Sequence, residues 1–533
     1  MHILAYDIGT TGVKTCVFRV GKTIELLSGA SGDYKLYVLP GGGAEQEPDE
    51  WWAAMAQTTR KALAEANVQP QDIAGISFCS QMQGLVLVDQ HGVPLRRAFS
   101  YMDQRATEQH KRGMAHGLQV AGGNAVKLLR SLKATGAAAL SVKDPVWKYK
   151  WVQQHEPEIF ARTHKWLDVK EALIARMTGR CVMTPDSAFA TLLYDIHKQQ
   201  WSKSICNMLG VDMNHLPEIL PCTAQVGKLR PQQAEELGLA AGIPVFGGGG
   251  DAALVGVGAG AVEIGDTHIY CGTSGWVSTV VGKSMVDASA NIAAILGAQP
   301  GLFNYFAEQE TAGKCLEWVK NHLALDEINV YLNKTFKHEC PDQETQYASL
   351  YDYLMEVISQ AAIGSGGVIF TPWLHGNRCP FEDPAARGMF FGLSLETGKT
   401  EMIRAVVEGV VYHLRWMLET QHKKIATSQT IRFVGGGALS DVMCQILADC
   451  TGRTVETVAS PQNVGSMGAA AVAAVGCGAI DSLAQAKAII PAVKTYQPNP
   501  QHTARYDKYF AVYKQLHKAN KNAFAQLLFL QKK

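Results

Sequence analysis

The sequence predicts an α/β protein made of two related domains that face each other across a ligand site, and three observations support this. A hairpin with a hydroxyl-rich turn occurs twice, around residues 9–12 and 272–275. A strand that runs into a glycine-rich turn and a helix also occurs twice, over 243–259 and 431–450. The 533 residues are too many for one ordinary core. Because repeated units predict architecture and ligands commonly bind between domains, we expect the repeats to enclose the site.

Composition restricts the class of protein and its partners. Hydrophobic residues make up 47% of the chain and charged residues 18%, which is typical of a globular protein with ample core. The 49 basic and 48 acidic residues leave a net charge of +1, which predicts neither a nucleic acid nor a membrane as partner. The 12 cysteines include no C-x-x-C pair, and the N-terminus enters a strand pattern without a signal peptide. We therefore expect a cytoplasmic protein that binds a small molecule.

Periodicity and turn signals predict the elements of the first half. The helix predicted at 49–66 has an acidic first turn after a proline, which is a typical start signal. In chain order we expect strands at 3–7, 13–19 and 23–27, a helix at 49–66, strands at 73–79 and 85–89, alternating helices and loops over 100–240, and a strand at 243–246.

The second half repeats much of this pattern. The apolar run from Met467 to Ile480 is short for a membrane span and rich in alanine and glycine, so we expect a buried, closely packed helix. In chain order the other elements are strands at 267–271 and 276–281, a strand at 431–434, a helix at about 440–450, and a mostly helical tail over 505–530.

The two hairpin turns suit the binding of phosphate. Gly9-Thr10-Thr11-Gly12 and Gly272-Thr273-Ser274-Gly275 each offer backbone N–H groups and two hydroxyls without bulky side chains. One such turn alone would be an ordinary tight turn. Because the turn occurs twice, we favour a pair of hairpins that hold adjacent phosphates of one nucleotide.

Two charged residues flank the first hairpin. A carboxylate beside a phosphate loop is repelled unless a cation lies between them, so Asp7 predicts Mg²⁺, held directly or through water. The alternative is an Asp that bonds its own turn. Lys14 could reach phosphate oxygens, and it could equally be a solvated strand residue.

Asp251 follows Gly247-Gly248-Gly249-Gly250 at a predicted helix start, where it could be an N-cap or a catalytic base. The run alone favours the cap. The second glycine turn, Gly435-Gly436-Gly437, is followed by Ala438 and not by an acid. Since we match the two glycine turns, a turn of this kind can form without an acid after it. This favours Asp251 as a catalytic base over Asp251 as an N-cap. The second turn lacks the G-x-G-x-x-G spacing of a dinucleotide fold, which disfavours a dehydrogenase.

Taken together and in order, these motifs resemble the FGGY family of carbohydrate kinases, in the actin/hexokinase-like ATPase superfamily. The resemblance covers nearly the whole chain. Besides the motifs above, it includes Gly376-Asn377-Arg378-Cys379-Pro380 and the segment from Arg404 to Gly409. It implies two ribonuclease H-like ATPase domains that face each other across a catalytic cleft, and an ATP- and Mg²⁺-dependent transfer of phosphate to a sugar or polyol hydroxyl.

The resemblance also implies roles for residues of this chain. Asp251 would be the catalytic base and Asp7 the acidic residue of the metal site. The nucleotide would contact the two hairpins and the second glycine turn. These predicted contacts are Gly9, Thr10, Thr11, Lys14, Gly272, Thr273, Ser274, Gly435, Gly436, Gly437 and Ser440.

Within the family the chain is most similar to xylulokinases, which implies D-xylulose as substrate. Their substrate loop usually has the sequence Gln-Met-His-Gly, and here it is Gln81-Met82-Gln83-Gly84. The usual Trp-Asn-Asp segment is Tyr101-Met102-Asp103 here, which keeps the acid. A further segment, Asp186 to Ala190, also departs from the pattern. Because hydrogen-bonding sites discriminate sharply, another ketose, a polyol such as erythritol or glycerol, or a sugar acid stays open. We expect the sugar to contact Gln81, Met82, Gln83, Asp103 and Asp251.

We expect three segments: an N-terminal sugar-binding domain with the first phosphate hairpin at 1–255, a C-terminal nucleotide-binding domain at 256–490, and a helical tail packed on the body at 491–533. The expected partners are the sugar or polyol and ATP, and a homodimer is left open. The alternative outside the kinases is an actin-like or chaperone-type ATPase without a sugar substrate.

Overall fold

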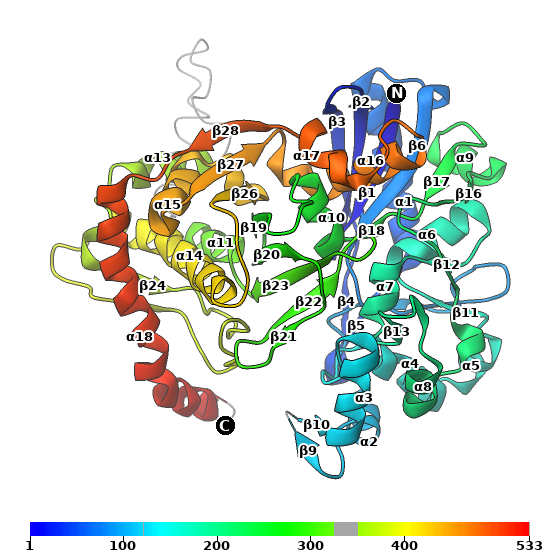
Figure 1. The fold of residues 1–533 in the computed structure, drawn as a ribbon, viewed down its shortest axis with the longest axis horizontal. Helices are drawn as coiled ribbons and strands as arrows, with labels where there is room; N and C mark the ends of the chain where they lie inside the picture. Colours follow the sequence, from blue (N-terminus) through cyan, green and yellow to red (C-terminus); the bar gives the residue numbers. More distant parts are fainter. Residues whose placement is uncertain (121, 324–349, 532–533) are drawn as a thin grey trace.

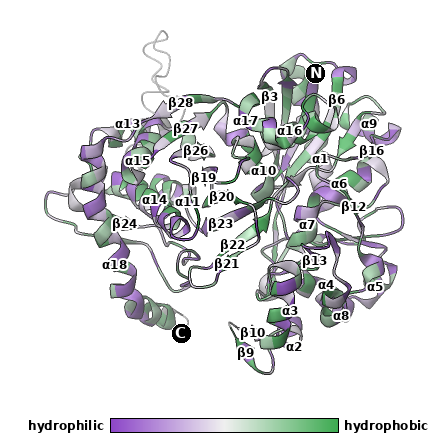
Figure 2. Cartoon of the chain, viewed as in Figure 1, coloured by the Kyte–Doolittle hydropathy of each residue, from purple (hydrophilic) through white to green (hydrophobic). Residues whose placement is uncertain are grey.

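The computed structural model describes all residues except 121, 324–349 and 532–533. Two central sheets organise the chain, one in the N-terminal half and one in the C-terminal half (Figure 1). Figure 2 shows hydrophobic residues along the central strands and on α10, with hydrophilic residues on the outer helices. Hydrophobic cores lie on both faces of each sheet.

The N-terminal sheet begins with an antiparallel meander, and two parallel strands then extend it past the first strand. Its order is β16 (Gln225–Lys228), β17 (Pro244–Phe246), β6 (Ile73–Ser80), β1 (His2–Ile8), β2 (Gly12–Val20) and β3 (Ile24–Asp33), with β18 (Gly249–Gly250) also paired to β6.

The C-terminal sheet repeats this order, since β19, β26 and β27 are parallel neighbours and β20 and β23 complete the meander. Its order is β21 (Val286–Asp287), β22 (Ile292–Leu296), β23 (Phe303–Gln309), β20 (Gly275–Val281), β19 (Thr267–Cys271), β26 (Thr430–Val434), β27 (Thr454–Val458) and β28 (Ala492–Tyr496). The predicted internal repeat is therefore present.

The sheet order corrects one detail of the predicted repeat. Strand β26, which precedes Gly435, is the parallel neighbour of β19, so its equivalent is β6 beside β1. The strand before Asp251 is β17, one position further out, and its equivalent is β27. Matching the turn at 247–250 with the turn at 435–437 was therefore wrong, because the position of a strand in its sheet cannot be inferred from a glycine run.

Strand β3 is longer than the 23–27 that the sequence predicts. It extends to Asp33, which pairs with Gly12 at the far end of β2. Most of the added residues, Ser28 to Asp33, have low strand propensity, so pairing along the whole of β2 overrides local preference. The small residues also let α1 (Pro48–Ala66) pack closely on β3, because a Cβ on Gly32 would lie 2.9 Å from the Thr58 side chain on that helix.

Two helices join the halves. In Figure 1, α16 (Val464–Gly476, orange) lies beside β1 and β6 of the other half. Helix α10 (Asp251–Gly258) packs against the C-terminal sheet, where Ala252 O accepts a hydrogen bond of 3.0 Å from Asn304 Nδ2. The two helices touch backbone to backbone, since a Cβ on Gly468 would lie 2.2 Å from Leu254 O. The predicted buried helix is thus part of the junction between the halves.

The remaining elements surround the sheets. Helix α18 (Pro500–Gln531) packs against α14 (Lys399–His422) and α15 (Asp441–Thr451) at the outer side of the C-terminal half (Figure 1). The other helices are α2 (Thr107–Gly113), α3 (Ala125–Thr135), α4 (Pro145–His155), α5 (Pro157–Arg162), α6 (Val169–Thr178), α7 (Pro185–Ala190), α8 (Lys203–Leu209), α9 (Pro231–Leu237), α11 (Gly313–His322), α13 (Leu350–Ser359) and α17 (Ala486–Ile489).

Short strands pair outside the two main sheets. They are β4 (Tyr37–Leu39) with β5 (Gly43–Gln46) and β8 (Ala98–Phe99), β7 (Val86–Val88) with β11 (Lys165–Leu167), β9 (Gln119–Val120) with β10 (Gly123–Asn124), β12 (Val182–Met183) with β15 (Glu218–Ile219), β13 (Tyr194–Asp195) with β14 (Gln200–Trp201), and β24 (Ile369–Thr371) with β25 (Met389–Phe391). Among the helices of the described ranges, none is long and apolar enough to cross a bilayer.

Candidate active site

Asp251 is the first residue of α10, directly after the glycine run. The N-cap is Gly250, so the interpretation of Asp251 as the cap residue is wrong. Its Oδ1 accepts a hydrogen bond of 2.7 Å from Ala252 N–H. Burial raises the pKa of the Asp251 carboxyl to about 7; the Ala252 N–H opposes this shift and the charge of Asp7 adds to it. The carboxyl therefore titrates near neutral pH, which suits proton transfer.

The glycines before Asp251 allow very close packing. Gly248 has a φ of +67°, and a Cβ there would lie 2.2 Å from Phe78 O on β6. A Cβ on Gly250 would lie 2.2 Å from Met82 Sδ. The run therefore brings Met82, in the predicted substrate loop, directly against the residue that precedes Asp251.

Asp7 lies near the end of β1, opposite Lys14 on β2. Burial raises the pKa of the Asp7 carboxyl, and the charge of Lys14 opposes this shift. The start of α16 approaches it closely, since a Cβ on Gly465 would lie 2.7 Å from Asp7 Oδ2. The positive end of that helix dipole thus faces the carboxylate. Both joining helices therefore begin at this acidic pair, one at Asp251 and the other beside Asp7.

Lys14 makes a contact that the sequence did not predict. Its Nζ donates a hydrogen bond of 3.0 Å to Gln462 O, just before α16. The side chain is partly buried and links the first hairpin to the C-terminal half. It is thus neither a freely solvated strand residue nor far from the predicted phosphate site.

The first glycine of each hairpin turn donates a backbone hydrogen bond, to the third residue along in the first hairpin and to the second in the other. The N–H of Gly9 donates to Gly12 O, and the N–H of Gly272 donates to Ser274 O, each at 2.9 Å. Thr11 and Thr273 are exposed at the tips, while Thr10 and Ser274 are partly exposed. Both turns therefore present backbone and hydroxyl groups outward, as a phosphate site requires.

The second glycine turn packs against the base of the second hairpin. Gly435 has a φ of +91°, and a Cβ there would lie 2.6 Å from Cys271 O. Gly436 is exposed and has open space where a Cβ would point. Gly437 also packs on Cys271. Ser440 is the N-cap of α15, where its Oγ accepts from Met443 N–H at 3.2 Å.

The predicted substrate loop contains an unpaired acceptor. Gln46 Nε2 donates to Thr10 O at 2.6 Å, and Gln46 Oε1 accepts from Gln81 Nε2 at 2.9 Å. Because Thr10 O can only accept, this chain fixes the orientation of both amides. Gln81 Oε1 is then buried with no partner among the described residues. An unpaired buried acceptor is costly, so this atom fits a ligand hydroxyl.

Gln83 and Asp103 are held by protein groups. Gln83 has a φ of +64°, and its carbonyl accepts a hydrogen bond of 2.9 Å from the buried Lys148 Nζ. Burial lowers the pKa of Lys148 to about 8. The Asp103 carboxylate is buried and accepts from Ala44 N–H at 2.7 Å and from Arg105 Nε at 3.0 Å. Direct contact of Asp103 with a sugar stays a prediction.

One buried network supports the glycine run and was not predicted. Asp186 Oδ2 accepts from Gly250 N–H at 2.6 Å, and its Oδ1 accepts from Thr184 Oγ1 at the same distance. Lys170 Nζ donates to Thr184 Oγ1 at 2.7 Å and is paired with Glu171. All four side chains are buried. Nothing in the sequence signals this network, because Asp186 and Gly250 are 64 residues apart.

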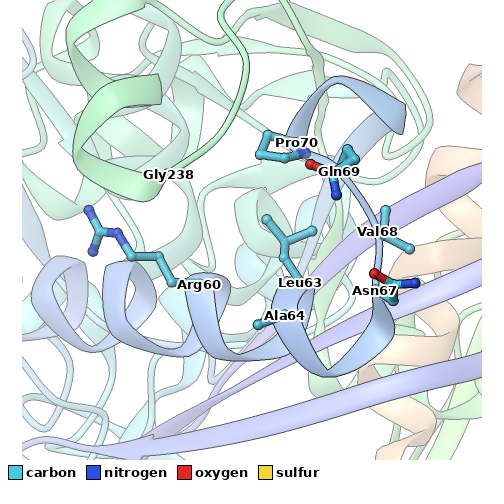
Figure 3. A pocket seen from close by; sticks show the side chains of 8 residues that line it. All are labelled: Arg60, Leu63, Ala64, Asn67, Val68, Gln69, Pro70 and Gly238. Atoms are coloured by element: carbon cyan, nitrogen blue, oxygen red, sulfur yellow. The ribbon is translucent and has the colours of Figure 1, made fainter.

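A separate cavity lies away from these residues. Figure 3 shows the residues that line it, between the end of α1 and Gly238. Its volume is about 270 Å³. Arg60, Asn67 and Gln69 are among its lining residues. None of the predicted site residues lines it, so it is not part of the candidate site.

Comparisons with known proteins identify the family and support the fold. Sequence profiles described as the N-terminal and C-terminal domains of the FGGY family of carbohydrate kinases match residues 2–258 and 268–477. A xylulose kinase from Lactococcus lactis is 30% identical over 534 residues, covering 99% of this chain and 98% of that protein. A gluconokinase from Bacillus licheniformis is 27% identical and covers 100% and 98%. The crystal structure of a ligand-bound xylulose kinase from Lactobacillus acidophilus has a TM-score of 0.81 at 24% identity and covers 99% of both chains.

Proposed function

The chain belongs to the FGGY family of carbohydrate kinases, and from this premise we propose that it transfers the γ-phosphate of ATP to a hydroxyl of a ketose, D-xylulose, with Asp251 as the general base. Membership makes the chain an ATP-dependent carbohydrate kinase with the two-domain actin/hexokinase-like fold. The substrate, the base and the metal site are the parts that we propose.

The observation that carries the proposal is the environment of Asp251. Its carboxyl, with a pKa of about 7, interacts with Asp7 at the first hairpin. The residue before it packs on Met82 of the loop that holds the unpaired Gln81 Oε1. The proposed base, the unpaired oxygen proposed to accept from the sugar and the proposed phosphate hairpin thus all lie near the start of α10.

In the proposed mechanism, Asp251 removes the proton of the attacking sugar hydroxyl. The hydroxyl oxygen forms a bond to the γ-phosphorus, the bond from that phosphorus to the bridging oxygen of ADP breaks, and the proton resides on the Asp251 carboxyl. In-line transfer of this kind depends mainly on positioning and charge neutralisation. Gln81 would orient the sugar, and the hairpins at 9–12 and 272–275 would hold the phosphates with their N–H groups and hydroxyls.

The residues present fit a Mg²⁺ ion at Asp7. No cluster of three or more His, Cys, Asp or Glu side chains in the described ranges forms a metal site of protein groups alone. Mg²⁺ is commonly held by one or two carboxylates together with substrate phosphates and water, so the single Asp7 suffices. When bound, the ion would neutralise phosphate charge, and its own charge would favour the ionised form of Asp251.

Gly435, Gly436 and Gly437 are proposed to lie against the adenosine, because Gly436 is exposed and its surroundings are open. Ser440, at the start of α15, is also proposed to lie near the adenosine. We also propose the domain limits 1–255 and 256–490 with a tail at 491–533. A homodimer stays a prediction.

The electrostatics favour a neutral sugar over a sugar acid. The charges of Asp7 and Glu308 both act on the Asp251 carboxyl. A substrate carboxylate would be repelled by this group of acids, whereas the hydroxyls of a ketose would not. Gluconate remains the second candidate because a gluconokinase is among the relatives.

We expect D-xylulose to give a kcat/KM at least tenfold above those of gluconate, erythritol and glycerol. The measurement is ADP release coupled to NADH oxidation, with each compound tested at several concentrations. A preference for gluconate would overturn the ketose assignment. ATP turnover that is independent of every sugar would favour the actin-like or chaperone-type alternative.

A pH profile tests the state of Asp251. Because the base must be ionised and its pKa is about 7, we expect kcat/KM for the sugar to fall about tenfold for each pH unit below that pKa. Bound Mg²⁺ would lower the pKa of Asp251. Raising the Mg²⁺ concentration is therefore expected to move the fall in kcat/KM to lower pH. A profile that is flat from pH 5 to 8 would contradict a titrating base.

A further inference from the structure

Tyr270 is a residue of the second hairpin that neither the sequence motifs nor the mechanism above uses. It lies on β19, two residues before Gly272. Its neighbours Ile269 and Cys271 point into the core under α14 and α15. Tyr270 points to the other face of the sheet, where its ring stacks on Trp276 with centroids 3.9 Å apart and planes at 16°. The stacking fixes the direction of the phenol.

The hydroxyl of Tyr270 lies at the hairpin turn. A Cβ on Gly272 would lie 2.2 Å from Tyr270 Oη, so the hydroxyl rests directly over the first glycine of the predicted phosphate turn. Burial raises the pKa of the Tyr270 phenol, and the nearby charges of Asp7 and Asp251 raise it further. The group is therefore a protonated O–H donor at neutral pH.

This donor has no acceptor among the residues that the structure describes. No hydrogen bond from Tyr270 Oη to another residue of the described ranges occurs, although two carboxylates are close enough to influence it. Tyr34, beside the first hairpin, differs from Tyr270, because its Oη donates a hydrogen bond of 2.6 Å to Gly9 O. A preorganised donor without a partner, next to a hairpin of N–H groups, fits an acceptor supplied by a ligand.

We propose that Tyr270 Oη donates a hydrogen bond to an oxygen of the γ-phosphate of ATP. This inference rests on the proposed function, because it takes the hairpin at 272–275 as a phosphate site. The γ-phosphate is favoured over the β-phosphate, because the proposed base and metal-site residues both act on this hydroxyl and they define where the transferred group lies. A neutral donor there offsets the repulsion between the phosphate and the two acids.

The variant Tyr270→Phe tests the hydrogen bond and keeps the ring. The matched control is Tyr305→Phe on β23 of the same sheet, because Tyr305 is fully buried and its hydroxyl also lacks a partner within the described part of the chain. A purely structural Tyr270 would act through its stacking on Trp276, which phenylalanine preserves. Thermal unfolding of both variants is expected to match that of the wild type.

Nucleotide binding gives the decisive readout. By calorimetry with Mg²⁺, Tyr270→Phe is expected to weaken binding of the non-hydrolysable analogue AMP-PNP about tenfold and to leave ADP binding unchanged, whereas Tyr305→Phe changes neither. In the coupled assay, kcat of Tyr270→Phe is expected to fall about tenfold or more. Equal loss for ADP and AMP-PNP, or no loss for either, would overturn the inference. Absence of sugar phosphorylation by the wild type would refute the proposed function, while the nucleotide comparison would still decide the role of Tyr270.

Discussion

Replacing Asp251 with asparagine is expected to lower kcat for sugar phosphorylation by about 10² to 10⁴, because a positioned general base typically contributes that much. The amide keeps the size of the side chain and can still accept from Ala252 N–H. ATP binding is therefore expected to stay within a few-fold of the wild type. The coupled assay measures kcat, and calorimetry with AMP-PNP measures nucleotide binding.

The same substitution is expected to stabilise the free protein at high pH. The folded pKa of Asp251 is about 7 and its usual value is 3.8, so ionisation costs folding free energy as the pH rises from about 4 to 7. Above pH 7 the full cost is present. Since the residue is partly exposed, we expect Asp251→Asn to gain about 1 to 3 kcal/mol at pH 8 and almost nothing at pH 4.

The control is Asp72→Asn, which changes an exposed carboxylate far from the site. It is expected to alter neither kcat nor the pH dependence of unfolding. An Asp251→Asn variant that retained a tenth or more of wild-type kcat would contradict the role of base. Loss of activity together with loss of stability at pH 8 would indicate a structural role instead.

The second large effect is expected at the crossing of α10 and α16. Alanine normally stabilises a helix by about 1 kcal/mol relative to glycine. In Gly468→Ala, however, the new Cβ would lie 2.2 Å from Leu254 O, so the backbones of the two helices must separate. We expect a net loss of about 2 to 4 kcal/mol, seen as a lower midpoint in urea. Activity is expected to fall as well, because both helices begin at the acidic pair.

The comparison variant is Gly21→Ala, where no atom lies within 4 Å of the added Cβ. This change is expected to be neutral or slightly stabilising. Helix propensity alone predicts that Gly468→Ala stabilises the protein, whereas close contact of the two helices predicts that it destabilises it. The sign of the measured change in stability therefore distinguishes the two. A Gly468→Ala variant as stable as the wild type would show that the helices do not touch at this glycine.

The order of the sheets corrects one step that led from sequence to site. The true counterpart of α10 is α16, which follows β27 as α10 follows β17. The residues at the start of α16 are Asn463, Val464 and Gly465, so this counterpart lacks an acid as well. The argument that Asp251 is not needed for the turn therefore survives, with a different partner than the turn at 435–437.

Local signals predicted much of the candidate site. The hairpins, the glycine run and the helix that starts at Asp251 follow from turn chemistry and hydrophobic periodicity. The hydrogen bonds that hold these elements in place could not be predicted, because they join segments far apart in the sequence. Asp186 binds Gly250, and Lys14 binds the carbonyl of Gln462, 448 residues away. The orientation of Gln81 depends on Gln46 in the same way.

The central claim is that the site between the two halves phosphorylates a sugar with ATP. The most direct test is to incubate the wild-type protein with MgATP and D-xylulose and to quantify ADP and the sugar phosphate in the same sample by ³¹P NMR. We expect one sugar phosphate for each ADP, and at least about a hundredfold less of both products from Asp251→Asn in the same early interval. ADP formed without sugar phosphate, or an equal yield of sugar phosphate from Asp251→Asn, would contradict the claim.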